Sequence, residues 1–295
     1  MVRPTITYGA AIWYAPQGIV TSRKHVDRKL EVLQNKNLRN VLGAYRAVGS
    51  RILEKEAGIP PISLVLTAQV ANAAKRRLTS KGANIIKNAC ATIRNQAIRG
   101  GNRRRAPIAQ KKTPGELMTA WLQKNIPRST WKSEILQQAT AQNERPIPWK
   151  KAIRDHTQKS WDKAWTAYLA TIPLGTVKAP AQLLTTSYTP KIYFYVSKAT
   201  SSLITQIRIE KIGLNAFLAD RHVPDKQATC TCGNLRQTAK HILYFCPELA
   251  DRRISLFEAA GTRDYSKIVA TARGAKAAAI WLQSTGLLPQ FSLGL

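Results

Sequence analysis

Three cysteines and one histidine lie close together in the last quarter of the sequence. Residues 230–246 read CTCGNLRQTAKHILYFC and hold three of the four cysteines of the chain and one of its four histidines. Zinc in structural sites binds four ligands tetrahedrally, and three thiolates with one imidazole form a common set. The spacing C-x-C-x8-H-x4-C therefore predicts a Zn2+ site formed by Cys230, Cys232, His241 and Cys246.

The same four residues allow two other interpretations. The one-residue gap between Cys230 and Cys232 departs from the commoner gap of two to four residues. The first alternative is therefore a set of unrelated buried cysteines with a surface histidine. A redox role is disfavoured, because the usual dithiol motif has a two-residue gap. Four protein ligands leave no open coordination position, so we expect the ion to stabilise the fold and not to catalyse a reaction.

Local chain signals would bring the four ligands together. Gly233 permits the tight turn that directs two sulfurs to one ion. Thr238 is placed to cap a short helix that presents His241. Residues five apart diverge on one continuous helix, so a break is needed before Cys246. Pro247 suits the first position of the next helix and therefore predicts that break.

The composition narrows the class of partner. The 295 residues include 46 Lys and Arg against 16 Asp and Glu, a formal net charge of +30. Such self-repulsion destabilises a compact chain unless polyanions neutralise it, which favours RNA or DNA as the partner over an anionic membrane surface. No apolar run of about 18 residues occurs, so a spanning helix is not expected. Without a signal peptide or a disulfide framework, the expected location is intracellular, in the nucleus or cytoplasm.

The basic residues are concentrated in one region. Residues 57–115 contain no Asp or Glu but twelve Lys or Arg. The densest part, RGGNRRRAPIAQKK, has paired glycines and a proline that oppose a stable helix. We interpret it as a flexible basic connector that lies along a phosphate backbone; the alternatives are a solvated linker and a nuclear-localisation patch. The residues predicted to contact nucleic acid are Lys75, Arg76, Arg77, Arg99, Arg103, Arg104, Arg105, Lys111 and Lys112.

The remaining pattern is mostly helical. Strand signals occur only at residues 3–14 and in YTPKIYFYV at 188–196. A helix is expected at about 23–45, because Val26, Leu30, Leu33, Val41 and Tyr45 fall near helical spacing. After Pro61, a second amphipathic helix is expected, with its apolar face formed by Ile62, Val65, Leu66, Val70 and Ala73. Further helices are expected after Thr113, with Trp121 and Leu122 facing inward, and at about 200–220, 247–260 and 265–282.

An aromatic stripe also follows helical spacing. It consists of Trp161, Trp165, Tyr168, Leu169 and Ile172. Aromatic side chains can stack on bases, but at this spacing they are more often the buried face of a helix. We therefore interpret the stripe as core.

Segments on both sides of the chain resemble a known family. SSLITQIRIEKIGLNAFLADRHVP, CTCGNLRQTAKHILYFCP and the following DRR are similar to the C-terminal end of the reverse transcriptases of LINE-type non-LTR retrotransposons, particularly those of fungi. ITYGAAIWY, LEVLQNKNLRNVLGAYRAV and LEKEAGIPPISLVL are similar to the thumb of that family. Residues 75–195 carry little that matches, so the resemblance covers about half of the chain. It implies binding of RNA and DNA during target-primed reverse transcription, with the thumb on the template–primer duplex and the CCHC zinc knuckle on nucleic acid.

The chain departs from the family where catalysis is concerned. The polymerase needs aspartates that hold two metal ions, and no paired-aspartate motif occurs here. The family's endonuclease, fingers and palm would precede residue 1. A ribonuclease H needs several strands and a carboxylate cluster, whereas the acidic residues of the middle lie among helical patterns: Glu116, Glu134, Glu144, Asp155 and Asp162. His25, His156 and His222 have no Ser or Cys partner at a recognisable spacing, so no catalytic residue is predicted and the chain is not expected to be an enzyme.

These observations together predict a mainly α protein. The expected parts are a thumb-like region (1–80), the basic connector (81–115), a helical middle (116–199), a helix with the zinc knuckle (200–260) and a C-terminal helix (261–295). The expected function is that of a zinc-binding, nucleic-acid-binding fragment of a retrotransposon polyprotein, with no membrane and no small-molecule substrate. Two alternatives stay open: a decayed, partly folded remnant, or a part of a larger RNA-directed DNA polymerase whose palm is encoded upstream.

Overall fold

The computed structural model forms two compact units. The first comprises Met1–Val32 and Pro60–Trp165, and the second Leu33–Ile59 and Thr166–Leu295. The predicted division into five parts stays a prediction. The structure describes residues 7–10, 14, 24–79, 88, 92, 120–122, 124–126, 148–171 and 190–291.

The mainly α class predicted from the sequence is confirmed, and no strand occurs among the described residues. Both strand predictions are wrong where the structure describes them. Near the N-terminus, Tyr14 donates its backbone N–H to the carbonyl of Ala10 (2.8 Å), as in a helical turn, and both side chains are buried. Pro190–Tyr193 forms the 3-10 helix η4. In this short helix Ile192 is buried, and the hydroxyl of Tyr193 donates a hydrogen bond to Glu56. Tertiary packing therefore overrides the strand propensity of these two residues.

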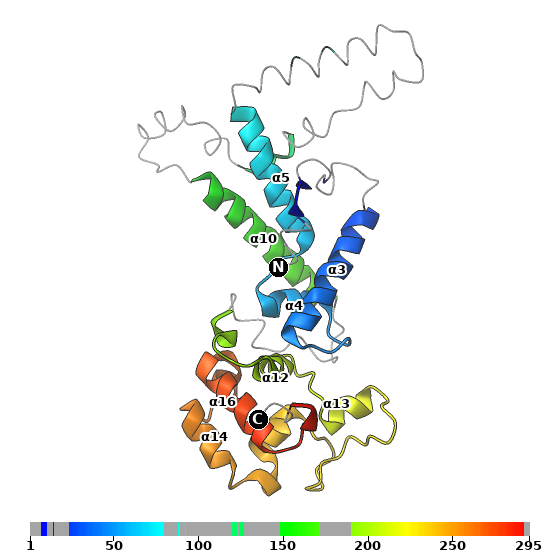
Figure 1. Ribbon diagram of the computed structural model, residues 1–295, viewed down its shortest axis with the longest axis vertical. Coiled ribbons are helices and arrows are strands. Elements are labelled where there is room, and N and C mark those ends of the chain that lie inside the picture. The colour runs from blue at the N-terminus through cyan, green and yellow to red at the C-terminus, as the bar shows by residue number, and fades with distance from the viewer. Residues whose placement is uncertain are drawn as a thin grey trace. The chain divides into compact units, whose positions relative to one another are not determined.

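The first unit is built around two antiparallel helices. Helix α5 (Ile62–Thr79) buries Ile62, Leu66 and Val70, the face that the sequence predicts. Helix α10 (Trp149–Ala170) is joined to it by a hydrogen bond from Trp149 Nε1 to Asn72 Oδ1 (2.6 Å). Both helices are labelled in Figure 1.

The predicted core residues of this unit are largely confirmed. Leu122 is fully buried and Trp121 packs against the same core. Trp161 and Trp165 are buried as well, which confirms the interpretation of these two as core residues. Ile172 and the predicted helix start at Thr113 lie outside the described residues.

Helix α3 (Lys24–Leu42) confirms the predicted helix, but the predicted face is wrong. Val26, Leu33 and Val41 are exposed, whereas Leu38 and Leu42 are buried. The helix ends at Gly43, whose φ of 65° turns the chain where the sequence pattern continued to Tyr45. The side chain of Lys198 donates to the last carbonyls of the helix, those of Asn40 (2.9 Å) and Val41 (2.5 Å).

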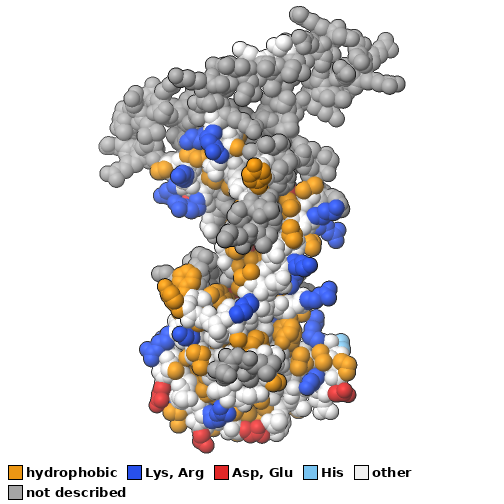
Figure 2. Space-filling view, in the orientation of Figure 1, with side chains coloured by type: hydrophobic (Ala, Val, Ile, Leu, Met, Phe, Trp, Pro, Cys, Tyr) orange, Lys and Arg blue, Asp and Glu red, His pale blue; other side chains and the backbone are white. Residues whose placement is uncertain are grey.

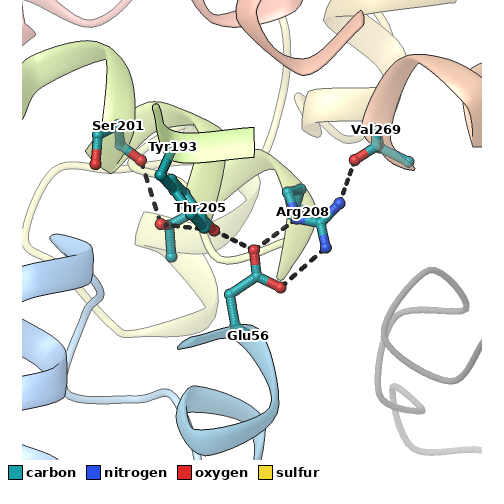
Figure 3. A network of polar contacts seen from close by, with 6 residues as sticks. All are labelled: Glu56, Tyr193, Ser201, Thr205, Arg208 and Val269. Atoms are coloured by element: carbon teal, nitrogen blue, oxygen red, sulfur yellow. Dashed lines mark hydrogen bonds and ion pairs between the residues drawn. The ribbon is translucent and has the colours of Figure 1, made fainter. Parts of the chain in front are cut away.

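A buried ion pair joins α4 (Ser50–Ala57) to α12 (Lys198–Arg208) within the second unit. Figure 3 shows Arg208 reaching both oxygens of Glu56 and the carbonyl of Val269. The hydroxyl of Tyr193 donates to the same carboxylate, and Thr205 donates to that hydroxyl at 3.3 Å. The network gives each buried polar group a partner, which such burial requires.

The rest of the second unit is a cluster of short helices. Helix α16 (Ala272–Ser284) contacts α12, α14 (Arg253–Ala260) and α15 (Tyr265–Ala270), and Figure 1 shows α12, α14 and α16 together. The remaining elements are α13 (Asn215–Asp220), the π-helix η5 (His241–Phe245), and the 3-10 helices η6 (Pro247–Leu249) and η7 (Pro289–Phe291).

The three long helices predicted in this region are each divided. The first is interrupted between Arg208 and Asn215, where Glu210 has a positive φ. The second begins as η6 and continues as α14 only from Arg253. The third is interrupted at Thr271, whose hydroxyl accepts the backbone N–H of Gly274 (3.1 Å) and starts α16. The spacing of apolar residues does not reveal where single residues such as Glu210 and Thr271 interrupt a helix.

None of the described helices is by itself long and apolar enough to span a lipid bilayer. By length and composition alone, the bent pair of helical segments Ser50–Ala57 and Ile62–Arg76 is together long and apolar enough to do so.

Candidate metal centre

The four predicted ligands lie together in the second unit. The sulfur atoms of Cys230, Cys232 and Cys246 and a ring nitrogen of His241 are all within 4.8 Å of one another. Cys230 Sγ is 3.9 Å from Cys246 Sγ, and Cys232 Sγ is 3.3 Å from His241 Nε2. The prediction that these residues form a group able to hold a metal ion is confirmed.

A tight turn places the first two sulfurs. The backbone N–H of Gly233 donates to the carbonyl of Cys230 (3.0 Å), and that of Cys230 donates to the carbonyl of Asn234 (2.9 Å). Gly233 has a φ of 87°, which non-glycine residues rarely adopt. The turn therefore depends on this glycine, as the sequence predicts.

A turn of π-helix places the other two ligands. The hydroxyl of Thr238 accepts the backbone N–H of His241 (3.1 Å), so the predicted cap is present. The backbone N–H of Cys246 donates to the carbonyl of His241 (2.8 Å), five residues earlier. This wider bond brings residues five apart onto one side, which an α-helix does not do. Cys246 itself is extended and precedes Pro247 at the first position of η6, which confirms the predicted break.

The sequence analysis missed two residues that support the ligands. The side-chain amide of Gln237 lies 3.8 Å from Cys230 Sγ, and its carbonyl oxygen accepts the backbone N–H of Asn215 (3.1 Å). The guanidinium of Arg253 donates to the carbonyl of Cys246 (2.6 Å). Only three-dimensional proximity identifies them, since neither residue type is a metal ligand.

Burial and neighbouring groups shift the pKa values of three of the four ligands in different directions. Burial and the nearby Arg253 lower the pKa of His241, which favours the neutral imidazole that a metal requires. Burial, with the neighbouring Cys232 and Cys230, raises the pKa of Cys246 to about 11. For Cys230, burial opposes ionisation, but hydrogen bonds from the Cys232 backbone and from side chains including Gln237 outweigh it and lower the pKa. A metal ion would supply the positive charge that clustered thiolates need.

The separations also fit a tetrahedral ion. At a tetrahedral angle, zinc–sulfur bonds of about 2.3 Å and zinc–nitrogen bonds of about 2.0 Å put two sulfurs about 3.8 Å apart and a sulfur and nitrogen about 3.5 Å apart. The observed 3.9 Å and 3.3 Å are close to these values. A disulfide, at about 2.05 Å, is far shorter, and the three cysteines are free.

The structure describes only part of the predicted nucleic-acid-binding set. Lys75 lies on α5 with its ammonium over the ring of Trp149 (4.8 Å), and Arg76 is exposed beside it. Arg77 lies on the same helix, and nothing is described of its side chain. The other predicted contacts lie outside the described residues: Arg99, Arg103, Arg104, Arg105, Lys111 and Lys112.

Comparisons with known proteins gave no relative. No protein-family model, no curated protein and no solved structure matches this chain.

Proposed function

We propose that this protein is a zinc-binding, nucleic-acid-binding protein, related to the C-terminal part of the reverse transcriptases of LINE-type retrotransposons. The observation that carries the proposal is the Cys230, Cys232, His241 and Cys246 group, with its sulfur and nitrogen atoms within 4.8 Å. The resemblance of residues 201–253 and of the thumb-like segments supplies the family.

Zinc is the metal that the donor set favours. Three thiolates and one imidazole are soft or borderline ligands, which select zinc over magnesium or calcium. All four positions of a tetrahedron would be filled by protein, so the ion would stabilise the knuckle fold. Residues 230–246 would then be a folded element that depends on the ion.

The positive charge supports nucleic acid as the partner. Neutralising phosphates releases counterions, and a chain of +30 gains strongly from that release. Two arginines of the second unit are engaged with the protein itself. Arg252 donates to the carbonyl of Ser284 (2.6 Å), and Arg273 to that of Ala259 (2.7 Å). We therefore assign most phosphate contacts to the acid-free stretch at residues 57–115.

We do not propose that this protein polymerises nucleotides. It has no paired aspartates to hold two metal ions. We expect primer-extension assays with the purified chain to give no product, and a processive product would contradict this part of the proposal.

The salt dependence of binding tests the nucleic-acid proposal. If about six to ten phosphates are contacted, affinity falls about 10³- to 10⁵-fold between 50 and 200 mM salt. The variant Arg103→Gln, Arg104→Gln, Arg105→Gln should weaken binding to all sequences alike and flatten that dependence.

The matched control removes the same charge elsewhere. It replaces the exposed Lys226, Lys267 and Lys276 by Gln and should change the salt slope less. Equal effects of the two variants would show that bulk charge, and not the basic connector, sets the affinity. A shallow salt response of the unaltered protein would contradict nucleic-acid binding itself.

A further inference from the structure

A cavity of about 260 Å³ lies between α5 and α10 in the first unit. Its volume is at the small end of ligand sites and suits a single ring system with its substituents. The cavity is lined by the polar side chains of Ser63, Thr67, Asn125, Thr157 and Ser160 and by Trp121.

Three polar side chains of the cavity each have a donor engaged with the backbone and keep an oxygen that can accept. Thr67 and Thr157 donate their hydroxyl protons to the carbonyls of Ser63 (2.7 Å) and Ile153 (2.8 Å). Asn125 donates its amide to the carbonyl of Trp121 (2.8 Å), which leaves its own carbonyl oxygen as an acceptor. The oxygens of these three side chains can therefore accept hydrogen bonds from a ligand with N–H donors.

The aromatic wall of the cavity is held in place. The ring of Trp121 meets that of His156 edge to face, with centroids 5.2 Å apart and planes at 88°. Burial and then the nearby Lys159 lower the pKa of His156, so this wall carries no charge at neutral pH. A flat, uncharged ring could contact the indole as bases contact aromatic side chains in single-strand-binding proteins.

Basic side chains gather at one end of this cavity. The bond between Trp149 and Asn72 brings the start of α10 beside Lys75 and Arg76. Lys150, Lys151 and Arg154 are exposed on the first two turns of α10. Figure 2 shows Lys and Arg side chains gathered in this region.

Arg154 lies within one helical turn of the cavity residues of α10. Arg154 precedes the cavity residue Thr157 by three positions, or about 4.5 Å along the axis. At the start of α5, the hydroxyl of Tyr14 donates to the carbonyl of Ser63 (3.4 Å), and the carboxylate of Asp27 is near enough to raise the pKa of Tyr14 further, after burial. The side of Lys150 and Arg154 therefore favours a phosphate over the side of Asp27.

We propose that the cavity receives one unpaired base of a single-stranded nucleic acid, while Lys150 and Arg154 hold the adjacent phosphates. This rests on the proposed function and deepens it, because a base within a duplex cannot enter the cavity. The site combines residues of the middle region, to which the family resemblance assigns nothing, with residues of α5 such as Ser63 and Thr67.

Fluorescence anisotropy with three probes tests the site. The probes are a single-stranded hexanucleotide, an abasic strand with the same number of phosphates, and a free nucleoside monophosphate. Trp121→Ala should weaken binding of the hexanucleotide about 5- to 150-fold, which corresponds to the loss of one stacking contact between a base and an aromatic side chain. The affinity for the abasic strand should not change. Ala68→Leu fills the cavity and keeps Trp121, so it should likewise weaken binding of the hexanucleotide and leave binding of the abasic strand unchanged. Agreement between the two variants would show that the effect of Trp121→Ala does not come from a folding defect.

A pair of charge variants on one helix tests the phosphate side. Lys150→Gln with Arg154→Gln should reduce the salt slope of hexanucleotide binding by about 1.4, at about 0.7 for each contact to a single strand. Lys163→Gln removes a charge from the same helix beyond the cavity residues and should leave the slope unchanged.

The outcomes separate this inference from the proposed function. If both strands bind the unaltered protein equally, or if the cavity variants affect both alike, the base site is wrong and nucleic-acid binding stands. Binding of the free nucleotide as tight as that of the hexanucleotide would overturn the strand assignment. If no nucleic acid binds the full chain at low salt, the proposed function itself fails.

Discussion

Glu56 and Arg208 form a buried ion pair across 152 positions of sequence. Arg208 Nε lies 2.5 Å from Glu56 Oε1, and Arg208 Nη2 lies 3.2 Å from Oε2. Their side chains are 0% and 3% exposed. The pair therefore joins helix α4 to helix α12, two elements that are far apart in the sequence.

Breaking this pair should destabilise the second unit strongly. Arg208→Met leaves the Glu56 carboxylate buried without its charge partner, which costs about 3–5 kcal/mol. Adding Glu56→Gln should recover much of that loss, because an amide removes the charge and still accepts from Tyr193. Urea unfolding followed by far-UV circular dichroism measures both variants.

The exposed pair Arg236–Asp220 provides the control for this prediction. Its nitrogen–oxygen distance is 2.7 Å, but both side chains are 54% exposed. Solvent screens such pairs, so Arg236→Met should change the free energy of unfolding by no more than about 1 kcal/mol. Equal losses for Arg208→Met and Arg236→Met would contradict the account of the buried pair.

Gly43 should tolerate no side chain. A Cβ atom there would lie 2.1 Å from Ser202 Oγ and 2.4 Å from Ser202 Cβ. Gly43→Ala therefore adds a clash, of about 1–3 kcal/mol, to the cost of a left-handed backbone in alanine. Gly286 has a φ of 74° and open space around it, so Gly286→Ala isolates the backbone cost. Thermal unfolding of the two variants should show the larger loss at Gly43.

Stability should depend on His156 below neutral pH. Burial and then Lys159 lower the pKa of His156 from its ordinary 6.5, so the unfolded chain takes up the proton first as the pH falls. Its contribution to stability is therefore fully present above pH 6.5 and is lost as the pH falls from there through the lower folded pKa. His156→Gln should flatten this segment of the stability profile, and NMR titration of the imidazole should give a value below 6.5.

Much of the metal site could be predicted from the sequence because its signals are local. Gly233, Thr238 and Pro247 each act within a few residues, and the structure has each as predicted. The π-helical turn between His241 and Cys246 was not predicted, since neither residue spacing nor capping residues indicate a hydrogen bond between residues five apart.

The buried face of a helix was predicted correctly where the buried residues are apolar and follow helical spacing. The prediction was wrong where a helix buries polar side chains. Helix α5 shows the predicted face, but α3 buries Asp27 and Gln34 and exposes Val41. The partners of such buried polar residues are distant in sequence, as Glu54 is for Gln34 (3.4 Å). No pattern along the chain reveals contacts of that kind.

Arg253 should tune the affinity for zinc without binding the ion. It donates to the carbonyl of the ligand Cys246, and three thiolates with one Zn2+ carry a net negative charge that its guanidinium would offset. Loss of such outer contacts typically costs 10- to 100-fold in metal affinity, which we expect for Arg253→Met. Its neighbour Arg252 instead donates to Ser284, so Arg252→Met should leave zinc affinity unchanged in a chelator competition assay.

Metal content of the purified protein, with and without Cys230→Ser, tests the central claim most directly. The account predicts one zinc per chain, bound by Cys230, Cys232, His241 and Cys246, and its loss in the variant together with protection of residues 230–246 in hydrogen exchange. A well-folded protein that contains no zinc, or a variant that keeps both its zinc and this protection, would contradict the assignment of the metal centre.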